Sequence, residues 1–162
     1  MQVKRRGRLR FLAMSSGASD LLEGETTGAV IGGFRTAHRT LGFGYREHIY
    51  SLALERELLA MGLRVAREVS VMVFYRGEPL ARQTFDMVVN DRVIVEIKTG
   101  EHLASTARDQ LFSYLCSTNI EVGMLLHFGH KPTFRRVFCE NRFKLHGPVD
   151  GAIRRPDEPK SR

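Results

Sequence analysis

The chain has 162 residues, of which 43% are hydrophobic and 27% are charged, so it suits one folded domain with tails. No apolar run reaches the length of a membrane-spanning helix, and the apolar stretch that follows the basic N-terminus is too short for a signal peptide. These features predict a cytoplasmic protein that does not span a membrane.

The net charge of +7 is unevenly distributed along the chain. Residues 1–10 carry five basic and no acidic side chains, residues 131–162 carry nine basic and four acidic ones, and the segment between them has a net charge of −3. Basic ends attract a polyanion such as a nucleic acid. At this point, tails that only keep the protein soluble explain the charge equally well.

Both ends of the chain differ in composition from its middle. Residues 1–24 lack hydrophobic periodicity and predict a disordered basic leader. Residues 147–162 mix prolines with charges and predict a flexible charged tail. The folded domain is therefore expected over residues 25–146.

The first part of this domain has the pattern of two helices. Thr26 or Thr27 is expected to cap a helix that runs to about residue 41, with Gly42 as its end. A second helix is expected over about 45–61, followed by Gly62.

Beyond residue 62, β-branched and aromatic residues predict mostly strands. The expected elements are strands at about 65–75, 80–89 and 93–98, a helix from Ser105 or Thr106 to about 117, and strands at about 121–128 and 133–139. The strand at 93–98 is apolar on both faces, which is typical of a strand inside a covered sheet. The predicted order is ααβββαββ, an α/β class.

Two acidic residues and a lysine stand out in these strands. Glu96 and Lys98 are two residues apart and share a face of their strand. If the hairpin loop is the three residues 90–92, Val89 faces Val93 and Asp86 faces Glu96. A two-residue loop would instead place Phe85 opposite Glu96 and turn Asp86 away.

Carboxylates that face each other repel, and a divalent cation such as Mg²⁺ relieves this repulsion. Such a cation polarises a phosphodiester and lowers the pKa of a bound water. Lys98 would orient that water or neutralise charge on the phosphate. The competing interpretation is a salt bridge in which Lys98 only neutralises Glu96.

Two helical pairs are candidates to complete the site. Glu47 and Tyr50 share a face of the second helix, and Gln110 and Tyr114 share a face of the third. Taken alone, each pair is explained at least as well by packing or surface polarity. The two cysteines, at 116 and 139, form no CxxC motif, so we expect reduced cysteines in or near the core.

The segment Gly44-Tyr-Arg-Glu47-His-Ile-Tyr50 resembles the signature of the GxxExxY protein family. The resemblance continues to about residue 138 and covers about 26–138. It includes Leu54, Glu57-Leu58, Gly62-Leu63, Tyr75-Arg-Gly77, Asp86, Glu96-Ile97-Lys98, Gln110, Tyr114-Leu115, the run Gly123 to Gly129, and Arg135-Arg136-Val137.

That family is placed in the PD-(D/E)XK nuclease-like superfamily, so the resemblance implies a mixed central sheet of about five strands flanked by helices. It implies Asp86, Glu96 and Lys98 as the core triad, Glu47 as a supplementary metal ligand, and Gln110 as a contributor from the third helix. Candidates for contacting nucleic acid are Tyr50, Tyr114, Arg135 and Arg136. Phe85 replaces the proline that names the superfamily's motif, and Ala107 stands where relatives often carry histidine.

Two functions follow from this resemblance and the residues above. The first is a nuclease that uses Mg²⁺ (or Mn²⁺), held by Asp86, Glu96 and Glu47, to hydrolyse DNA or RNA. The alternative is a catalytically silent nucleic-acid-binding or assembly module that keeps the fold. A domain this small rarely encloses a duplex alone, so a homodimer or a protein partner fits either function.

Overall fold

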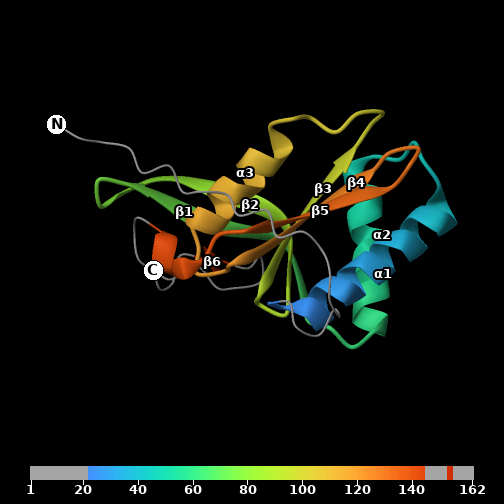
Figure 1. Cartoon of the computed structure of the whole chain (residues 1–162), viewed down its shortest axis with the longest axis horizontal. Coiled ribbons are helices and arrows are strands. Elements are labelled where there is room, and N and C mark those ends of the chain that lie inside the picture. Colours follow the sequence, from blue (N-terminus) through green and yellow to red (C-terminus); the bar gives the residue numbers. More distant parts are fainter. Residues whose placement is uncertain (1–21, 145–152, 155–162) are drawn as a thin grey trace.

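The computed structural model describes residues 22–144 and 153–154. Most of the predicted leader and tail therefore lies outside the described residues. The elements are α1 (Gly24–Leu41), α2 (Glu47–Ala60), β1 (Val65–Tyr75), β2 (Glu78–Val89), β3 (Val93–Thr99), α3 (Ala107–Cys116), β4 (Val122–Phe128), β5 (Thr133–Phe138), the short 3₁₀ helix η1 (Asn141–Phe143) and β6 (Ile153–Arg154). The predicted order of helices and long strands is confirmed (Figure 1).

One mixed sheet organises the fold. Its strand order is β5-β4-β3-β2-β1-β6. Only β3 and β4 among the described strands are parallel neighbours, and α3 is the crossover that joins them. The remaining neighbours are antiparallel. The sheet therefore matches the predicted mixed sheet of five strands, to which the unpredicted two-residue strand β6 adds a pairing with β1.

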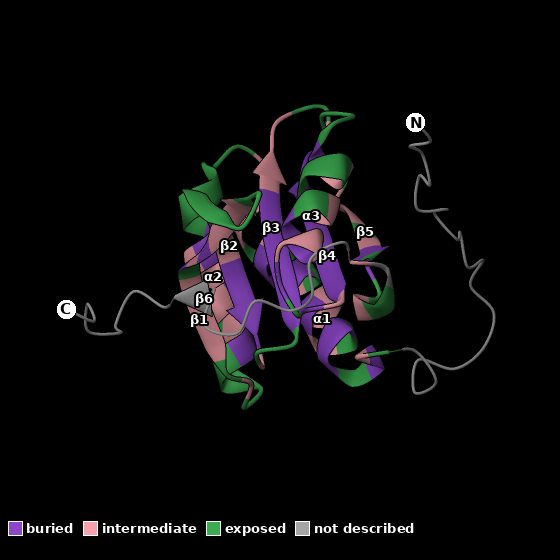
Figure 2. Ribbon diagram, turned by 90° about the vertical axis from the view of Figure 1, so that its left-hand side faces the viewer, coloured by how far each residue is buried: buried purple, intermediate pink, exposed green. Residues whose placement is uncertain are grey.

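Helices cover both faces of the sheet, so its central strands are buried (Figure 2). α1 and α2 pack on one face, where Val95 and Ile97 of β3 belong to their core. α3 packs on the other face with Ile94. Because successive side chains of a strand point to opposite faces, Glu96 and Lys98 lie on the α3 face with Ile94.

The predicted caps of two helices are wrong in detail. α1 begins at Gly24, ahead of both predicted caps, and the hydroxyl of Thr27 donates back to the carbonyl of Glu23 at 2.9 Å. Thr106 does precede α3, but its side chain makes no capping hydrogen bond. The predicted end of α1 is confirmed, because Gly42 adopts φ 73° and its N–H donates to His38 at 2.7 Å. None of the described helices is long and apolar enough to span a membrane.

β2 pairs with β3 over a short distance only. The register runs from Val89↔Val93 to Met87↔Val95, as the predicted three-residue loop requires. Asn90 and Asp91 take the left-handed conformation in that loop, with φ 52° and 60°. Beyond Met87 the strands part, and the β1–β2 hairpin extends away from β3 (Figure 1).

Candidate active site

The first candidate ligand, Asp86, lies where β2 and β3 part. The strand pairing stops at Met87↔Val95, one residue before the predicted Asp86–Glu96 pair. In place of a further pairing, Oδ2 of Asp86 accepts a hydrogen bond from the backbone N–H of Ile97 at 2.7 Å. This bond holds the carboxylate beside the residue that follows Glu96.

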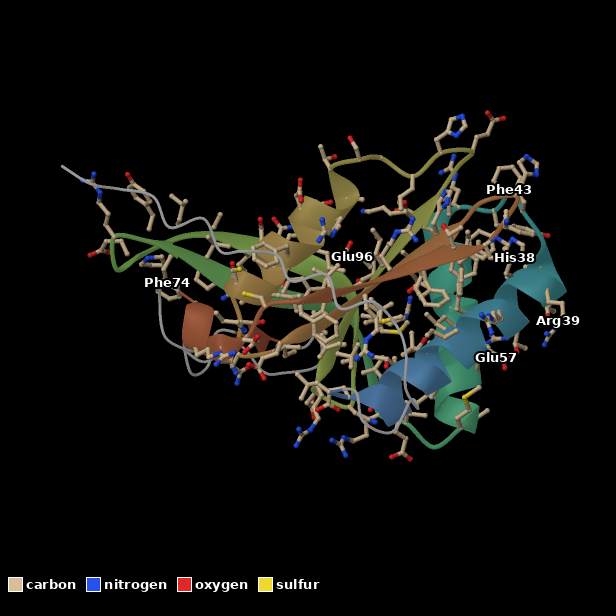
Figure 3. The ribbon with its side chains drawn as sticks, in the orientation of Figure 1. His38, Arg39, Phe43, Glu57, Phe74 and Glu96 are labelled. Atoms are coloured by element: carbon tan, nitrogen blue, oxygen red, sulfur yellow. The ribbon has the colours of Figure 1, made fainter. Side chains whose placement is uncertain are left out.

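The second candidate ligand, Glu96, is 5% exposed and lies near the centre of the fold (Figure 3). Its Oε2 lies 3.6 Å from Nζ of Lys98, whose side chain is 27% exposed. Its Oε1 is buried and has no hydrogen-bond partner. A buried polar atom without a partner costs about 1–3 kcal/mol, so it calls for a physical explanation.

The pKa of each carboxylate is raised by its burial. Burial and, after it, the negative charge of Asp86 together raise the pKa of Glu96 to about 8, although Lys98 opposes both. Burial also raises the pKa of Asp86, against the opposing effects of the Ile97 hydrogen bond and Lys98. Two carboxylates, one with an unpaired oxygen, can hold a hydrated divalent cation such as Mg²⁺ or Mn²⁺, which would favour their ionised forms. The described residues supply no third His, Cys, Asp or Glu ligand beside them, so water would have to complete the coordination.

The structure brings the predicted pair of α3 next to these carboxylates. Tyr114 is 7% exposed and accepts a hydrogen bond from Nε2 of Gln83 at 2.9 Å. Burial and, after it, the negative charge of Glu96 together raise the pKa of Tyr114 to about 12, although a hydrogen bond with Gln110 opposes them. Tyr114 is therefore a neutral hydroxyl at neutral pH, held between α3 and β2.

Glu47 and Tyr50 are not gathered with the carboxylates. Glu47 is exposed in the first turn of α2. The described part of the chain contains no group of three or more His, Cys, Asp or Glu side chains that could hold a metal, so Glu47 does not complete a three-carboxylate site there.

Tyr50 is fully buried and is not available to contact nucleic acid. Its hydroxyl donates to the carbonyl of Gly42 at 2.6 Å, and its ring stacks on Phe128 with centroids 4.1 Å apart. The expected surface role is therefore replaced by a packing role: this side chain joins the start of α2 to the end of α1 and to β4.

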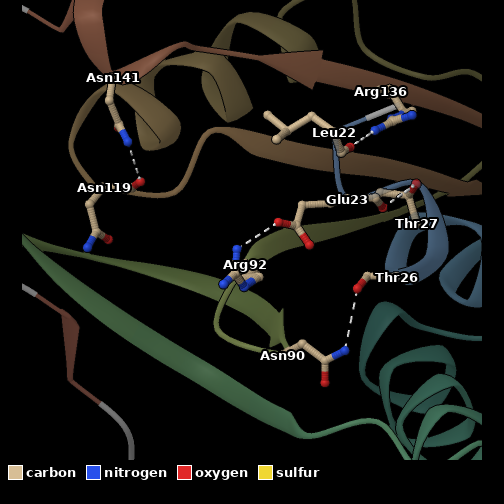
Figure 4. A network of polar contacts seen from close by, with 9 residues as sticks. All are labelled: Leu22, Glu23, Thr26, Thr27, Asn90, Arg92, Asn119, Arg136 and Asn141. Atoms are coloured by element: carbon tan, nitrogen blue, oxygen red, sulfur yellow. Dashed lines mark hydrogen bonds and ion pairs between the residues drawn. The ribbon is translucent and has the colours of Figure 1, made fainter. Parts of the chain in front are cut away.

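The two arginines of β5 point to opposite faces. Arg135 is exposed and lies in register with Leu125, which in turn lies in register with Glu96. Arg136 is half-buried and donates to the carbonyl of Leu22 (Figure 4). Only Arg135 therefore stands on the same face of the sheet as the carboxylates.

Sequence reasoning missed two residues beside the site. Gln83 holds the hydroxyl of Tyr114, and its spacing of two from Phe85 was the signal that could have placed both on the α3 face. Glu68 interrupts the pairing of β1 with β2, adopts φ 52°, and raises the pKa of Asp86 through its charge. No pattern in the sequence marks the left-handed backbone at Glu68.

One comparison with known proteins shows the superfamily of this chain. The family model described as the PD-(D/E)XK nuclease superfamily matches residues 24–137, so the chain belongs to that superfamily. A search of curated proteins gave no match. A crystal structure of SSO0001 shares 20% sequence identity with this chain at a TM-score of 0.46, over 79% of this chain and 60% of that one. This chain thus spans about three fifths of the length of that protein.

Proposed function

We propose that this protein is a nuclease that uses Mg²⁺ or Mn²⁺, bound by Asp86 and Glu96, to hydrolyse phosphodiester bonds of DNA or RNA. The observation that carries the proposal is the buried Oε1 of Glu96, which has no hydrogen-bond partner beside a second carboxylate. A salt bridge with Lys98 gives a partner only to Oε2 of Glu96 and leaves Oε1 without one. A bound cation would give Oε1 a partner and would relieve the repulsion between the carboxylates.

The side chains of the site have distinct tasks in this proposal. When bound, the cation supplies Lewis-acid activation of the phosphodiester and of a water. Asp86 and Glu96 provide the negative charge that holds it. Lys98, with 27% of its side chain exposed, orients the attacking water or donates to a phosphate oxygen. Exposed Arg135, on the same face, attracts the phosphate backbone.

Cleavage assays with Mg²⁺ and single- or double-stranded DNA and RNA test the catalytic part. We expect Lys98→Ala and Glu96→Gln each to lower the rate at least a hundredfold. Lys131→Ala, which removes the same charge from an exposed site outside the strands, is the matched control and should stay within about threefold of the wild type. Equal cleavage by the wild type and Lys98→Ala would overturn the proposal.

Calorimetry with Mn²⁺ tests the metal site without any need for activity. The wild type should bind one cation, and Asp86→Asn should lose this binding. Glu47→Gln should keep the wild-type affinity within about threefold, because Glu47 is exposed and outside the carboxylate pair. Salt-dependent binding of nucleic acid without any cation binding or cleavage would favour the silent nucleic-acid-binding module instead.

A further inference from the structure

The two cysteines of the chain face each other. Sγ of Cys116 lies 2.9 Å from Sγ of Cys139, although 23 residues separate them in the sequence. Both are free thiols, Cys139 buried and Cys116 half-buried. Cys116 is the last residue of α3, and Cys139 directly follows the last residue of β5. The thiols thus meet where the end of the crossover helix packs on the edge of the sheet.

Hydrogen bonds fix the backbone at Cys139 and in the turn that follows Cys116. The backbone N–H of Cys139 donates to the carbonyl of Glu121 at 3.0 Å. Nζ of Lys144 donates to the carbonyls of Thr118 and Ile120 at 2.7 and 2.8 Å, which fixes the turn that follows α3. A disulfide bond is about 2.05 Å long, so the sulfurs need to approach by less than about 1 Å to be bonded.

We propose that Cys116 and Cys139 are a disulfide-forming pair that cross-links the C-terminal end of α3 to the end of β5 under oxidising conditions. A shared metal ion does not explain the pair, because the described residues offer no group of three or more His, Cys, Asp or Glu ligands. The nuclease chemistry does not use either thiol, so the cross-link is a separate property of the fold.

The oxidation balances with a small-molecule disulfide as the oxidant. The thiolate of half-buried Cys116 attacks one sulfur of the reagent and releases one reagent thiolate. The thiolate of Cys139 then attacks Sγ of Cys116, forms the protein disulfide and releases the second reagent thiolate. The two protons lost by the cysteines pass to the two released thiolates, so one disulfide is reduced as one is formed.

The reaction is expected to be slow near neutral pH. Burial and, after it, the neighbouring thiol of Cys139 together raise the pKa of Cys116 to about 12, so little thiolate is present. The pair therefore differs from a fast peroxide sensor, whose attacking cysteine has a low pKa. Formation over minutes to hours matches uncatalysed exchange.

The test incubates the full chain with oxidised glutathione and follows free thiols and mass after alkylation in denaturant. The wild type has only two cysteines, so thiol counting is unambiguous. We expect both thiols to be lost together in a monomer that has lost two hydrogen atoms, with recovery in dithiothreitol. Because the cross-link closes a loop of some two dozen residues, the melting temperature of the oxidised protein should rise by about 5–10 °C.

Cys116→Ser and Cys139→Ala are the controls, and oxidised glutathione should leave their melting temperatures within about 1 °C of the reduced value. Cys116 is half-buried at a helix end, so its serine variant serves alone if Cys139→Ala does not fold. Three results would overturn the proposal: a stable glutathione adduct on one cysteine with the other thiol free, a disulfide-linked dimer, or two thiols that both stay free.

Discussion

The carboxylate of Asp86 bonds to the backbone N–H of Ile97, on the neighbouring strand, at 2.7 Å. This contact lies just beyond the last strand pair, Met87↔Val95. A side-chain hydrogen bond therefore connects the two strands where the backbone pairing has ended. A candidate metal ligand is thereby also part of the sheet. Removing it affects stability and chemistry together, and the two effects need different variants to be separated.

Asp86→Ala should lower the free energy of unfolding by about 1–3 kcal/mol, because the N–H of Ile97 loses its partner. Asp86→Asn keeps an oxygen acceptor and should lose less than about 1 kcal/mol, while still losing cation binding. Urea unfolding in the presence of a chelator measures the difference. Equal stability of the two variants would show that the hydrogen bond contributes nothing.

The raised pKa of Glu96 predicts how stability depends on pH. The folded protein holds a proton on Glu96 up to about pH 8, whereas the unfolded chain releases it near 4.5. The folded state thus binds more protons in this window, so stability without cation falls as pH rises from about 4.5 to 8.

Glu96→Gln lacks this titration. It should be more stable than the wild type by about 1–3 kcal/mol at pH 8 and no more stable at pH 4.5. Urea unfolding in chelator at several pH values tests this. Saturating Mg²⁺ should reduce the difference in unfolding free energy between Glu96→Gln and the wild type at pH 8, because it stabilises the wild type alone. A gap that is constant with pH would mean that Glu96 is ionised in the folded protein.

Tyr50→Phe should destabilise the fold without weakening nucleic-acid binding. The hydroxyl donates to Gly42 within a buried environment, so its loss should cost about 1–2 kcal/mol. Thermal unfolding and a binding titration on the same preparation test both parts. Weaker binding at unchanged stability would return Tyr50 to the surface role expected from the sequence.

Gly123→Ala should loosen α3 from the sheet. A Cβ at this position of β4 would lie 3.0 Å from Cγ and Cδ1 of Leu111, so the Leu111 side chain has to give way by a few tenths of an ångström against the packing of α3, at a cost of about 1–3 kcal/mol. Gly28→Ala is the matched control, because no atom lies within 4 Å of its added Cβ and it stands inside α1. That variant should gain about 0.5–1 kcal/mol. Urea unfolding of both variants decides.

Arg135→Ala and Arg136→Ala should behave differently, although they are neighbours. Arg135 is exposed on the sheet face that carries the carboxylates, so its loss should weaken nucleic-acid binding. It should also reduce the salt slope, which is the slope of the logarithm of the binding constant against that of the salt concentration, by about 1. Arg136 is half-buried and contacts the Leu22 carbonyl, so its loss should chiefly lower stability. Titrations at several salt concentrations distinguish the two. Equal salt slopes for Arg135→Ala, Arg136→Ala and the wild type would mean that neither arginine contacts the phosphate backbone.

Local chemistry made part of the site predictable. The loop residues Asn90 and Asp91 tolerate left-handed backbone, which predicted the observed Val89↔Val93 register; the expected pairing of Asp86 with Glu96 is not part of that register. The bond from Ile97 to Asp86 was not predictable, because alternation along a strand does not say where two strands part.

Other features depended on tertiary packing. Helical spacing placed Tyr50 beside Glu47, but it does not distinguish a face turned to the core from one turned to a ligand. Similarly, the proximity of Cys116 and Cys139 arises because α3 and β5 both flank β4, which sequence spacing conceals.

Because β2 pairs with β3 over only three residues, side-chain contacts help to connect the two parts of the sheet. The β1–β2 hairpin is joined to β3 by three residue pairs and the Asp86–Ile97 bond, and to α3 by the Gln83–Tyr114 bond. Asp86 lies on one part and Glu96 on the other, so the Asp86–Ile97 bond helps to fix the position of one candidate ligand relative to the strand that carries the other.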